Sequence, residues 1–231
     1  VYKVKRHPDG TVERFKARLV ARGDTQTPGE DFDETYAPVA KFCSIRCFLV
    51  TAFQYCLTIY HLDIETAYLN ATLEEEIYME RPPGFKPDNA LVCRLLKCLY
   101  GLKQAGRRRH EEFRGTLLHM GWLQAKSDGC LFTYQKNQLR MQLCLYVDDI
   151  LLAVPSAQNL AKFEADLSKK YVVKNLGELH WYLGMEILRD GHEMLLSQRV
   201  YTEKILERFG MKDSKPAKTP MDSKGTSCRD A

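Results

Sequence analysis

The sequence predicts an α+β fold in which antiparallel hairpins and helices are mixed along the chain. Three observations support this class. Several segments alternate apolar and polar residues, turn residues separate these segments in pairs, and other segments carry apolar residues at helical spacing. The predicted strands do not each lead into a helix, so a parallel sheet of βαβ units is not expected.

The first third of the chain is expected to form a hairpin, a loop, a helix and a strand. The hairpin covers 1–23, with its second strand over 14–20. The loop covers 24–38, the helix 44–56 and the strand 58–62. The hairpin follows from alternating residues on either side of the turn sequence His7-Pro8-Asp9-Gly10. Ser44 is a suitable N-cap for the helix, and Asp63 falls at or near the end of the strand.

The remainder predicts further hairpins, helices and a polar tail. In order these are a Pro-rich loop over 81–90, a strand over 91–96, a helix over 107–120, strands over 131–134, 139–147 and 150–154, a helix after Ser156, a hairpin of strands 181–188 and 193–197, a helix over 200–209 and a polar segment over 211–231. The strands on either side of Asp148-Asp149 are apolar, which predicts a tight hairpin with both carboxylates at its tip.

The composition is ordinary for a soluble globular protein of one large or two small domains. The 231 residues are 45% hydrophobic and 28% charged, with a net charge of +4. No apolar run approaches the roughly 20 residues of a membrane span. The eight cysteines include no C-x-x-C pair, so they are predicted to be reduced and buried. The N-terminus has neither Met nor an apolar signal, so the chain is expected to be part of a longer one.

Three carboxylates point to a chemical function. Asp148 and Asp149 share a predicted hairpin tip, and a neighbouring strand could bring Asp63 within coordination range. Three hard oxygen ligands suit Mg²⁺, and two such ions about 3.5–4 Å apart could activate a 3′-hydroxyl and stabilise a pyrophosphate leaving group. Turn chemistry alone could also explain the acidic pair, although its apolar flanks argue for a buried pair that needs a counter-ion.

Tyr146-Val147-Asp148-Asp149 is the Y-x-D-D box of reverse transcriptases. The wider chain resembles the reverse transcriptase domain of the Pol polyprotein of copia-type LTR retrotransposons, in family order and over nearly its whole length. The matching segments are KARLVARGDTQTPGEDF (16–32), TYAPVAKFCSIR (35–46), LDIETAYLN (62–70), IYMERPPGF (77–85), LLKCLYGLKQA (95–105), LYVDDILLA (145–153), LGELHWYLGMEI (176–187) and LSQRVYTEKILERF (196–209).

This resemblance implies a polymerase right hand. Fingers would cover 1–38 and 71–104, the palm 39–70 and 105–190, and the start of the thumb with a C-terminal linker 191–231. The implied activity is RNA-directed DNA polymerisation, a nucleotidyl transfer of dNTPs onto a primer that copies retrotransposon RNA. Asp63, Asp148 and Asp149 would be catalytic and would hold two Mg²⁺ ions, for which Mn²⁺ could substitute. The backbone carbonyl of Ile64 would complete the metal shell.

The resemblance also assigns residues to the nucleotide and the primer. Tyr68 would exclude a 2′-hydroxyl; its alternative role is a core aromatic. Tyr100, Gly101 and Lys103 would cover the incoming nucleotide and template base, with Gly101 permitting close backbone approach. The triphosphate would contact Lys16, Arg18 and Arg22, which alternation places on one strand face and which could instead be a solvated face. The primer end would contact Tyr146, Leu183, Gly184 and Met185, of which the last three could be an ordinary bend.

The implied partners are an RNA or DNA template with its primer, dNTPs, a tRNA primer and other parts of the Pol polyprotein, without a membrane. The implied location is cytoplasmic, in a virus-like particle, and nuclear later in the cycle. One departure bears on activity: where the family usually has a Pro and, shortly after, a Trp, this chain has Gly106-Arg107-Arg108-Arg109-His110. These arginines could follow a nucleic-acid backbone or replace a core residue. The alternatives are therefore a decayed nucleic-acid-binding copy or a polymerase subdomain within a host protein.

Overall fold

The computed structural model describes residues 1–6, 11–82, 84, 92–191 and 193–219. The predicted turn at 7–10, most of the predicted loop over 81–90 and the end of the polar tail lie outside these residues. The chain divides into two compact units, Val1–Glu178 and Leu179–Ala231. Both mix helices with antiparallel strands, which confirms the predicted α+β class.

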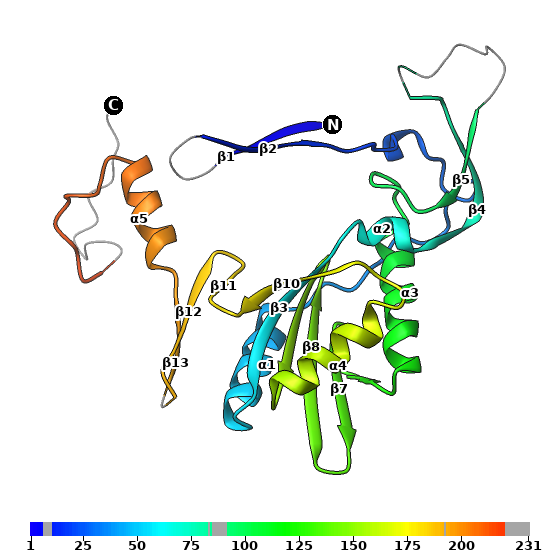
Figure 1. The fold of residues 1–231 in the computed structure, drawn as a ribbon. Coiled ribbons are helices and arrows are strands. Elements are labelled where there is room, and N and C mark those ends of the chain that lie inside the picture. Colours follow the sequence, from blue (N-terminus) through cyan, green and yellow to red (C-terminus); the bar gives the residue numbers. More distant parts are fainter. Residues whose placement is uncertain (7–10, 83, 85–91, 192, 220–231) are drawn as a thin grey trace. The chain divides into compact units, whose positions relative to one another are not determined.

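A six-stranded antiparallel sheet is the centre of the first unit (Figure 1). Its order is β10-β3-β9-β8-β7-β6, formed by β10 (Val173–Glu178), β3 (Thr58–Ile64), β9 (Asp149–Val154), β8 (Leu139–Tyr146), β7 (Leu131–Lys136) and β6 (Leu123–Gln124). The tight hairpin of β8 and β9 is confirmed, and both strands are largely buried. The edge strand β10 was not predicted, because most of its residues are exposed and its apolar residues do not alternate.

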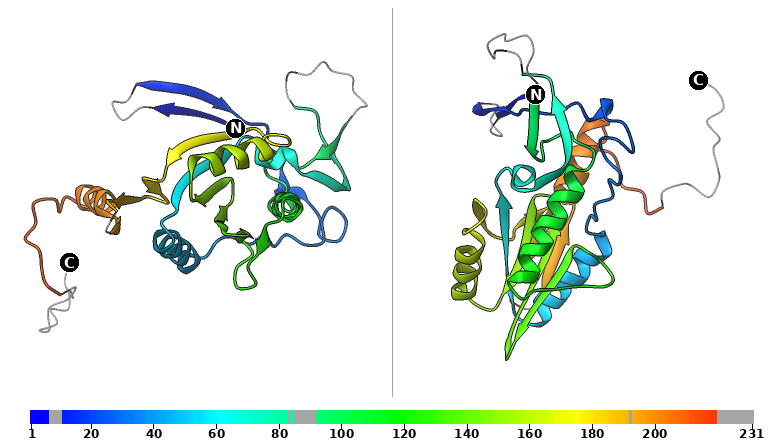
Figure 2. Two further views of the ribbon diagram at one scale, coloured as in Figure 1. Left: turned by 60° about the horizontal axis from the view of Figure 1, so that its bottom comes forward. Right: turned by 90° about the vertical axis from the view of Figure 1, so that its right-hand side faces the viewer.

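Helices cover both faces of this sheet. They are α1 (Phe42–Gln54), α3 (Ala105–His119) and α4 (Ala157–Leu167). Figure 2 shows α1 and α4 on opposite sides of the strands. On one side, the Thr51 hydroxyl of α1 donates to the Gln142 side-chain oxygen of β8 at 2.9 Å. On the other, the Trp122 ring lies 5.5 Å from the Phe163 ring of α4. Both faces of the sheet are therefore at least partly covered by helices.

The predicted N-cap of α1 is wrong. The helix begins at Phe42, so Ser44 lies in its first turn. The cap comes instead from Asp128, whose carboxylate accepts the Lys41 backbone N–H at 3.1 Å. A carboxylate that is distant in the sequence thus satisfies a free amide at the helix start. The cap predicted at Ser156 is confirmed, because its hydroxyl accepts the Asn159 amide of α4.

The cysteines differ partly from expectation. The seven that the structure describes are all free, as predicted. However, Cys43, Cys47 and Cys56 are exposed, while Cys98, Cys130 and Cys144 are buried. The buried residues of α1 are Ile45, Phe48, Leu49 and Ala52. This stripe turns Cys43 and Cys47 towards solvent.

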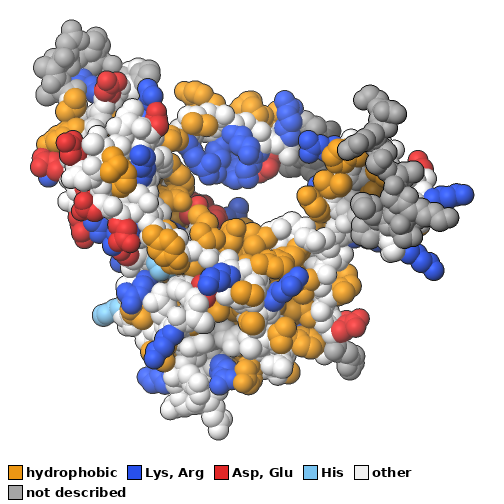
Figure 3. All heavy atoms as spheres, turned by 180° about the vertical axis from the view of Figure 1, so that it is seen from behind, with side chains coloured by type: hydrophobic (Ala, Val, Ile, Leu, Met, Phe, Trp, Pro, Cys, Tyr) orange, Lys and Arg blue, Asp and Glu red, His pale blue; other side chains and the backbone are white. Residues whose placement is uncertain are grey.

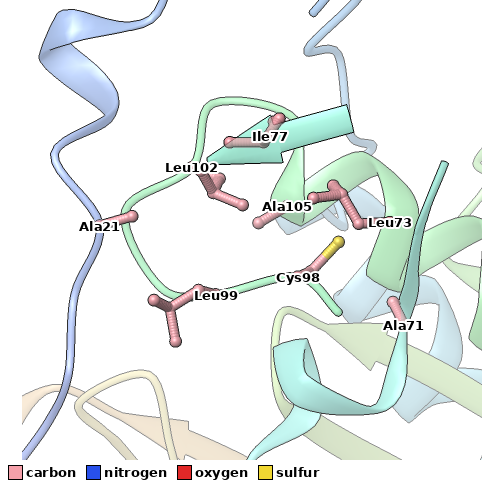
Figure 4. Close-up of a cluster of buried hydrophobic side chains, with 8 residues drawn as sticks. All are labelled: Ala21, Ala71, Leu73, Ile77, Cys98, Leu99, Leu102 and Ala105. Carbon is pink, nitrogen blue, oxygen red and sulfur yellow. The ribbon is translucent and has the colours of Figure 1, made fainter. Parts of the chain in front are cut away.

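A second part of the first unit contains a smaller apolar core. It comprises the predicted N-terminal hairpin, β1 (Tyr2–Arg6) and β2 (Val12–Ala17), the short helices η1 (Gly23–Thr25) and α2 (Ala67–Asn70), and the paired strands β4 (Thr72–Met79) and β5 (Cys93–Lys97). Figure 4 shows the buried side chains of this core, which come from β4, from the segments after β2, α2 and β5, and from the start of α3: Ala21, Ala71, Leu73, Ile77, Cys98, Leu99, Leu102 and Ala105. Ala105 is the first residue of α3, so this core is continuous with a helix of the sheet layer.

The second unit contains a three-stranded antiparallel sheet and one helix. Its elements are β11 (Trp181–Tyr182), β12 (Met185–Arg189), β13 (Met194–Ser197) and α5 (Arg199–Arg208). The single strand predicted over 181–188 is broken, because Leu183 and Gly184 have φ of 50° and 78° and form a tight turn. Among the described residues of both units, no helix has the length and apolar character needed to span a bilayer.

Candidate active site

The sheet brings the strand of Asp63 against the acidic hairpin. Asp63 on β3 lies directly opposite Asp149 on β9 in the antiparallel register. The next amide, that of Ile64, donates to the backbone carbonyl of Asp148 at 3.4 Å. Directly opposed residues on antiparallel strands point to the same face, so Asp63 and Asp149 share one end of one face of the sheet. The backbone of β3 therefore places Asp63 beside the β8–β9 hairpin, as the sequence predicted.

The hairpin tip is conformationally strained. Only Val147 and Asp148 lie between β8 and β9, and Tyr146 pairs with Asp149 across the turn. Val147 has φ of 51°, a left-handed conformation that is unusual for a β-branched residue. Such a residue costs of the order of 1–3 kcal/mol and persists only where its surroundings enforce it. Here the two-residue turn enforces it and places Asp148 at the tip.

Asp148 faces a buried arginine. Arg109 of α3 is only 5% exposed, and its Nε lies 3.9 Å from Asp148 Oδ1. Neither Asp148 Oδ1 nor Arg109 Nη2 has a hydrogen-bond partner among the described atoms. Burial raises the pKa of Asp148, Arg109 opposes that increase, and Asp63 and Asp149 add to it. Asp148 is therefore a partly buried acid whose charge is balanced mainly by a guanidinium without a close hydrogen bond.

Asp149 is held by a histidine that sequence reasoning did not single out. Its Oδ1 lies 2.9 Å from Nε2 of His61, which is on β3 two residues before Asp63. Residues two apart on a strand share a face. A search for polar side chains on the face of Asp63 could therefore have found His61.

The donor chemistry of this site fits a divalent ion. The backbones of Asp63 and Asp149 lie opposite each other beside the tip that carries Asp148, and a buried carboxylate oxygen without a hydrogen bond is an atom that a hard cation would satisfy. Even so, no group of three His, Cys, Asp or Glu side chains within the described ranges is arranged to hold a metal ion. The expected close cluster of all three carboxylates is thus absent, because Asp149 turns to His61 and Asp148 lies beside Arg109. Metal binding by these acids and by the Ile64 carbonyl stays a prediction.

Two tyrosines lie next to the acids, as the sequence suggested. The rings of Tyr68 and Tyr100 meet edge to face with their centroids 4.7 Å apart, and the Arg18 guanidinium lies 5.1 Å from the centre of the Tyr100 ring. Burial raises the pKa of both phenols, and the charge of Asp148 raises both further. Tyr68 is half-buried, so it contributes to packing and also lies within the electrostatic field of the acids.

Gly101 permits a close approach between two segments of the chain itself. Gly101 has φ of +96°, and an added Cβ would lie 2.1 Å from the Ala21 carbonyl oxygen and 2.7 Å from Val20 Cγ1. The Ala21 amide also donates to the Tyr100 carbonyl at 2.7 Å. The role implied for Gly101 in nucleotide contact thus has a structural alternative, because the glycine joins the segment after β2 to the loop after β5.

Lys103 already has partners in the neighbouring loop. Its ammonium lies 3.4 Å from the Gln26 carbonyl and 4.9 Å from the centre of the Phe32 ring. Its contact with template or phosphate stays a prediction, and it would require exchange of these contacts for a ligand.

The three basic residues of the N-terminal segment do not share one strand face. Strand β2 ends at Ala17, so Arg18 and Arg22 lie beyond it and the predicted alternation is wrong. The chain leaves the hairpin there to bond with the loop at Tyr100. Lys16 and Arg18 still lie within the electrostatic reach of Asp63 and Asp148, respectively, whereas Arg22 pairs with Asp24 at 2.8 Å. Figure 3 shows Lys and Arg side chains gathered over the hairpin.

The arginine run of α3 does not form a free basic face. Arg107 pairs with Glu34 and Glu111, and Arg108 pairs with Glu74, Glu75 and Glu111. Arg109 is buried, at four-residue spacing from the buried residues Phe113 and Leu117. Of the two expectations for this run, replacement of a core residue is the one that applies to Arg109.

The residues predicted to contact the primer differ in accessibility. Leu183 is exposed at the β11–β12 turn, and nothing lies within 4 Å of an added Cβ at Gly184. Met185 on β12 is only 3% exposed. Tyr146, in the first unit, is half-buried beside the acidic tip. Direct primer contact by Met185 is therefore not supported by its burial.

An α+β domain with adjacent aspartates at a hairpin tip and a third on the next strand has the arrangement expected of a polymerase centre. The chain belongs to the reverse transcriptase family, because the model of the family described as "Reverse transcriptase (RNA-dependent DNA polymerase)" matches residues 1–223. This confirms the family that the motifs predicted.

The curated relatives are transposon polyproteins. The chain is 42% identical to the retrovirus-related Pol polyprotein from transposon TNT 1-94 of Nicotiana tabacum and covers 17% of that protein. It is also 42% identical to the Pol polyprotein from transposon RE2 of Arabidopsis thaliana, of which it covers 15%. Both alignments include 96% of this chain. The transposon Ty1-ER2 Gag-Pol polyprotein of Saccharomyces cerevisiae is 34% identical over 93% of the chain, which covers 12% of it. The chain thus spans less than a fifth of each of these three polyproteins.

Proposed function

We propose that the chain is the RNA-directed DNA polymerase domain of a retrotransposon Pol polyprotein and transfers dNTPs onto a primer paired with an RNA or DNA template. The observation that carries this proposal is the register of Asp63 opposite Asp149, with Asp148 at the adjoining tip. Family membership supports the reaction class. The right-hand division into fingers, palm and thumb belongs to the same proposal.

The acids and their neighbours would have distinct roles. Asp63, Asp148, Asp149 and the Ile64 carbonyl would hold two Mg²⁺ ions, which supply charge stabilisation at the reacting phosphate and lower the pKa of the attacking hydroxyl. Lys16 and Arg18 lie where an anionic triphosphate would be attracted. His61 Nε2 lies 2.9 Å from Oδ1 of Asp149 and would orient this carboxylate. The protein thereby contributes orientation and fixed charge.

Primer extension on poly(rA)·oligo(dT) tests this proposal directly. Asp148→Asn keeps the size of the side chain and removes its charge, so we expect nearly complete loss of extension with Mg²⁺ or Mn²⁺. Asp166→Asn is the matched control, because Asp166 is an acid on α4 that pairs with Lys169 away from the hairpin tip. Undiminished extension by Asp148→Asn would falsify the assignment. Circular dichroism spectra would show that both variants are folded.

A second candidate function has one observation in its favour. A buried cation already lies beside Asp148, as expected for a copy that keeps the fold but not turnover. Such a chain would bind primer–template without extending it. Fluorescence anisotropy with a labelled primer–template, combined with the extension assay, separates this candidate from an active polymerase.

A further inference from the structure

We infer that Arg109 is a resident cation of the acidic site, which balances Asp148 and thereby competes with a divalent ion for that carboxylate. The inference rests on the proposed function in so far as that function requires a metal at Asp148. It concerns a residue of helix α3, and it predicts the strength of metal binding separately from catalysis.

The buried Arg109 depends on Asp148 for a counter-ion. A guanidinium remains charged at neutral pH, and a buried charge without a counter-ion is strongly destabilising. Arg109 is 5% exposed, and Asp148 is the carboxylate that pairs with it among the described residues. The other neighbours of Arg109 include the Phe113 ring, whose centre is 5.7 Å from the guanidinium. Asp148 thus supplies the main negative charge that makes this burial tolerable.

The pair is nevertheless incompletely bonded. Its N–O distance is 3.9 Å, beyond the usual range of a hydrogen bond. Asp148 Oδ1 accepts no hydrogen bond and Arg109 Nη2 donates none among the described atoms. By contrast, the adjacent Arg108 lies 2.8 Å from Glu74 and 3.1 Å from Glu75. Asp148 therefore has charge compensation from Arg109 but still has an oxygen available to a ligand.

A divalent ion at this oxygen would lie close to a fixed positive charge. The repulsion acts in a partly buried region, where water screens it poorly. The arginine cannot lose its proton to relieve the repulsion, and its location inside α3 limits its movement. Arg109 should consequently weaken metal binding, and a neutral side chain of similar length should strengthen it.

The competing role for Arg109 is positioning of Asp148 for the metal. The two roles make opposite predictions. If Arg109 positions the carboxylate, its neutralisation leaves Asp148 misplaced and metal binding becomes weaker. If Arg109 competes with the metal, neutralisation makes binding tighter, and the increase depends on Asp148.

The test is Mn²⁺ binding to the complete 231-residue chain, measured by electron paramagnetic resonance of free Mn²⁺ and by isothermal titration calorimetry. Arg109→Met removes the charge and keeps much of the apolar stem, and we expect at least tenfold tighter binding. Arg109→Lys keeps a basic side chain beside Asp148 and should bind Mn²⁺ more weakly than Arg109→Met does. Arg107→Met is the control on the same helix, because Arg107 pairs with Glu34 and Glu111, and it should leave Mn²⁺ binding unchanged.

Further variants define what would overturn the inference. Adding Asp148→Asn to Arg109→Met should abolish the increase in affinity; persistence of the increase would place the metal elsewhere and refute the inference. Unchanged or weaker binding by Arg109→Met would also refute it. Arg109→Gln serves the same comparison if Arg109→Met does not fold by circular dichroism. Tighter Mn²⁺ binding without primer extension would uphold the role of Arg109 and count against the proposed polymerase activity.

Discussion

The contact between Gly101 and Ala21 makes Gly101→Ala a sharp test of how the N-terminal segment is attached. A Cβ at Gly101 would lie 2.1 Å from the Ala21 carbonyl oxygen, which is backbone and cannot rotate away. The substitution should therefore separate the segment after β2 from the loop after β5. The Ala21 amide, which donates to the Tyr100 carbonyl, should lose its protection from hydrogen exchange.

Two costs add at this position. A non-glycine residue with positive φ costs roughly 1–2 kcal/mol, and forcing additional atoms into a packed contact costs roughly 1–3 kcal/mol. Gly177→Ala is the matched control, because Gly177 has a similar φ of +91° and nothing lies within 4 Å of an added Cβ. The control should show only the first cost. The difference in unfolding free energy between the two variants should therefore equal the cost of the contact, about 1–3 kcal/mol.

Hydrogen exchange with mass spectrometry measures the local effect, and urea unfolding followed by circular dichroism measures the global one. A difference of about 1–3 kcal/mol corresponds to roughly 5-fold to 150-fold faster exchange of the Ala21 amide in Gly101→Ala, relative to its change in Gly177→Ala. Equal exchange of this amide in the two variants would contradict the close contact and the reasoning built on it.

Three further predictions concern the core, the thiols and the nucleotide. Leu117→Ala in α3 should lower the free energy of unfolding in urea by about 2–5 kcal/mol, because Leu117 is 0% exposed, whereas Leu118→Ala on the exposed side should change it by about 0.5 kcal/mol or less. Burial raises the pKa of Cys144 to about 12, so Cys144 should stay unlabelled by iodoacetamide at a pH of about 9 in the folded chain, whereas the exposed Cys43 should be alkylated. Tyr68→Ala should admit rNTPs in primer extension while Tyr68→Phe should not; unchanged sugar selection in Tyr68→Ala would indicate a purely structural ring.

The sequence was informative where local pattern and tertiary environment agree. Strand β8 alternates its apolar residues, and the polar tip at Asp148-Asp149 interrupts two buried strands, so the hairpin follows from pattern alone. The position of Asp63 at the end of a short apolar strand suggested that it would meet this tip. Antiparallel pairing of β3 with β9 realises that expectation.

Local pattern was insufficient where distant residues or irregular pairing decide the structure. Asp128 caps α1 from 87 residues away, which no rule for helix starts can detect. Strand β4 was missed because Glu74-Glu75-Glu76 interrupts its apolar residues, and its pairing with β5 shifts register in that segment. For the arginine run, the sequence left open a helix face along a nucleic-acid backbone or replacement of a core residue. Its four-residue spacing to Phe113 and Leu117 was the signal that Arg109 points inward.

The place of β3 within the sheet has a consequence for synthesis on the ribosome. This strand is translated early, but its two hydrogen-bonding neighbours, β9 and β10, are completed only at Val154 and Glu178. Until then both of its backbone edges are unpaired, which is a state prone to association with other chains. Nascent chains released before Val154 should therefore aggregate and lack the acidic centre, whereas release after Glu178 leaves the strand paired on both sides.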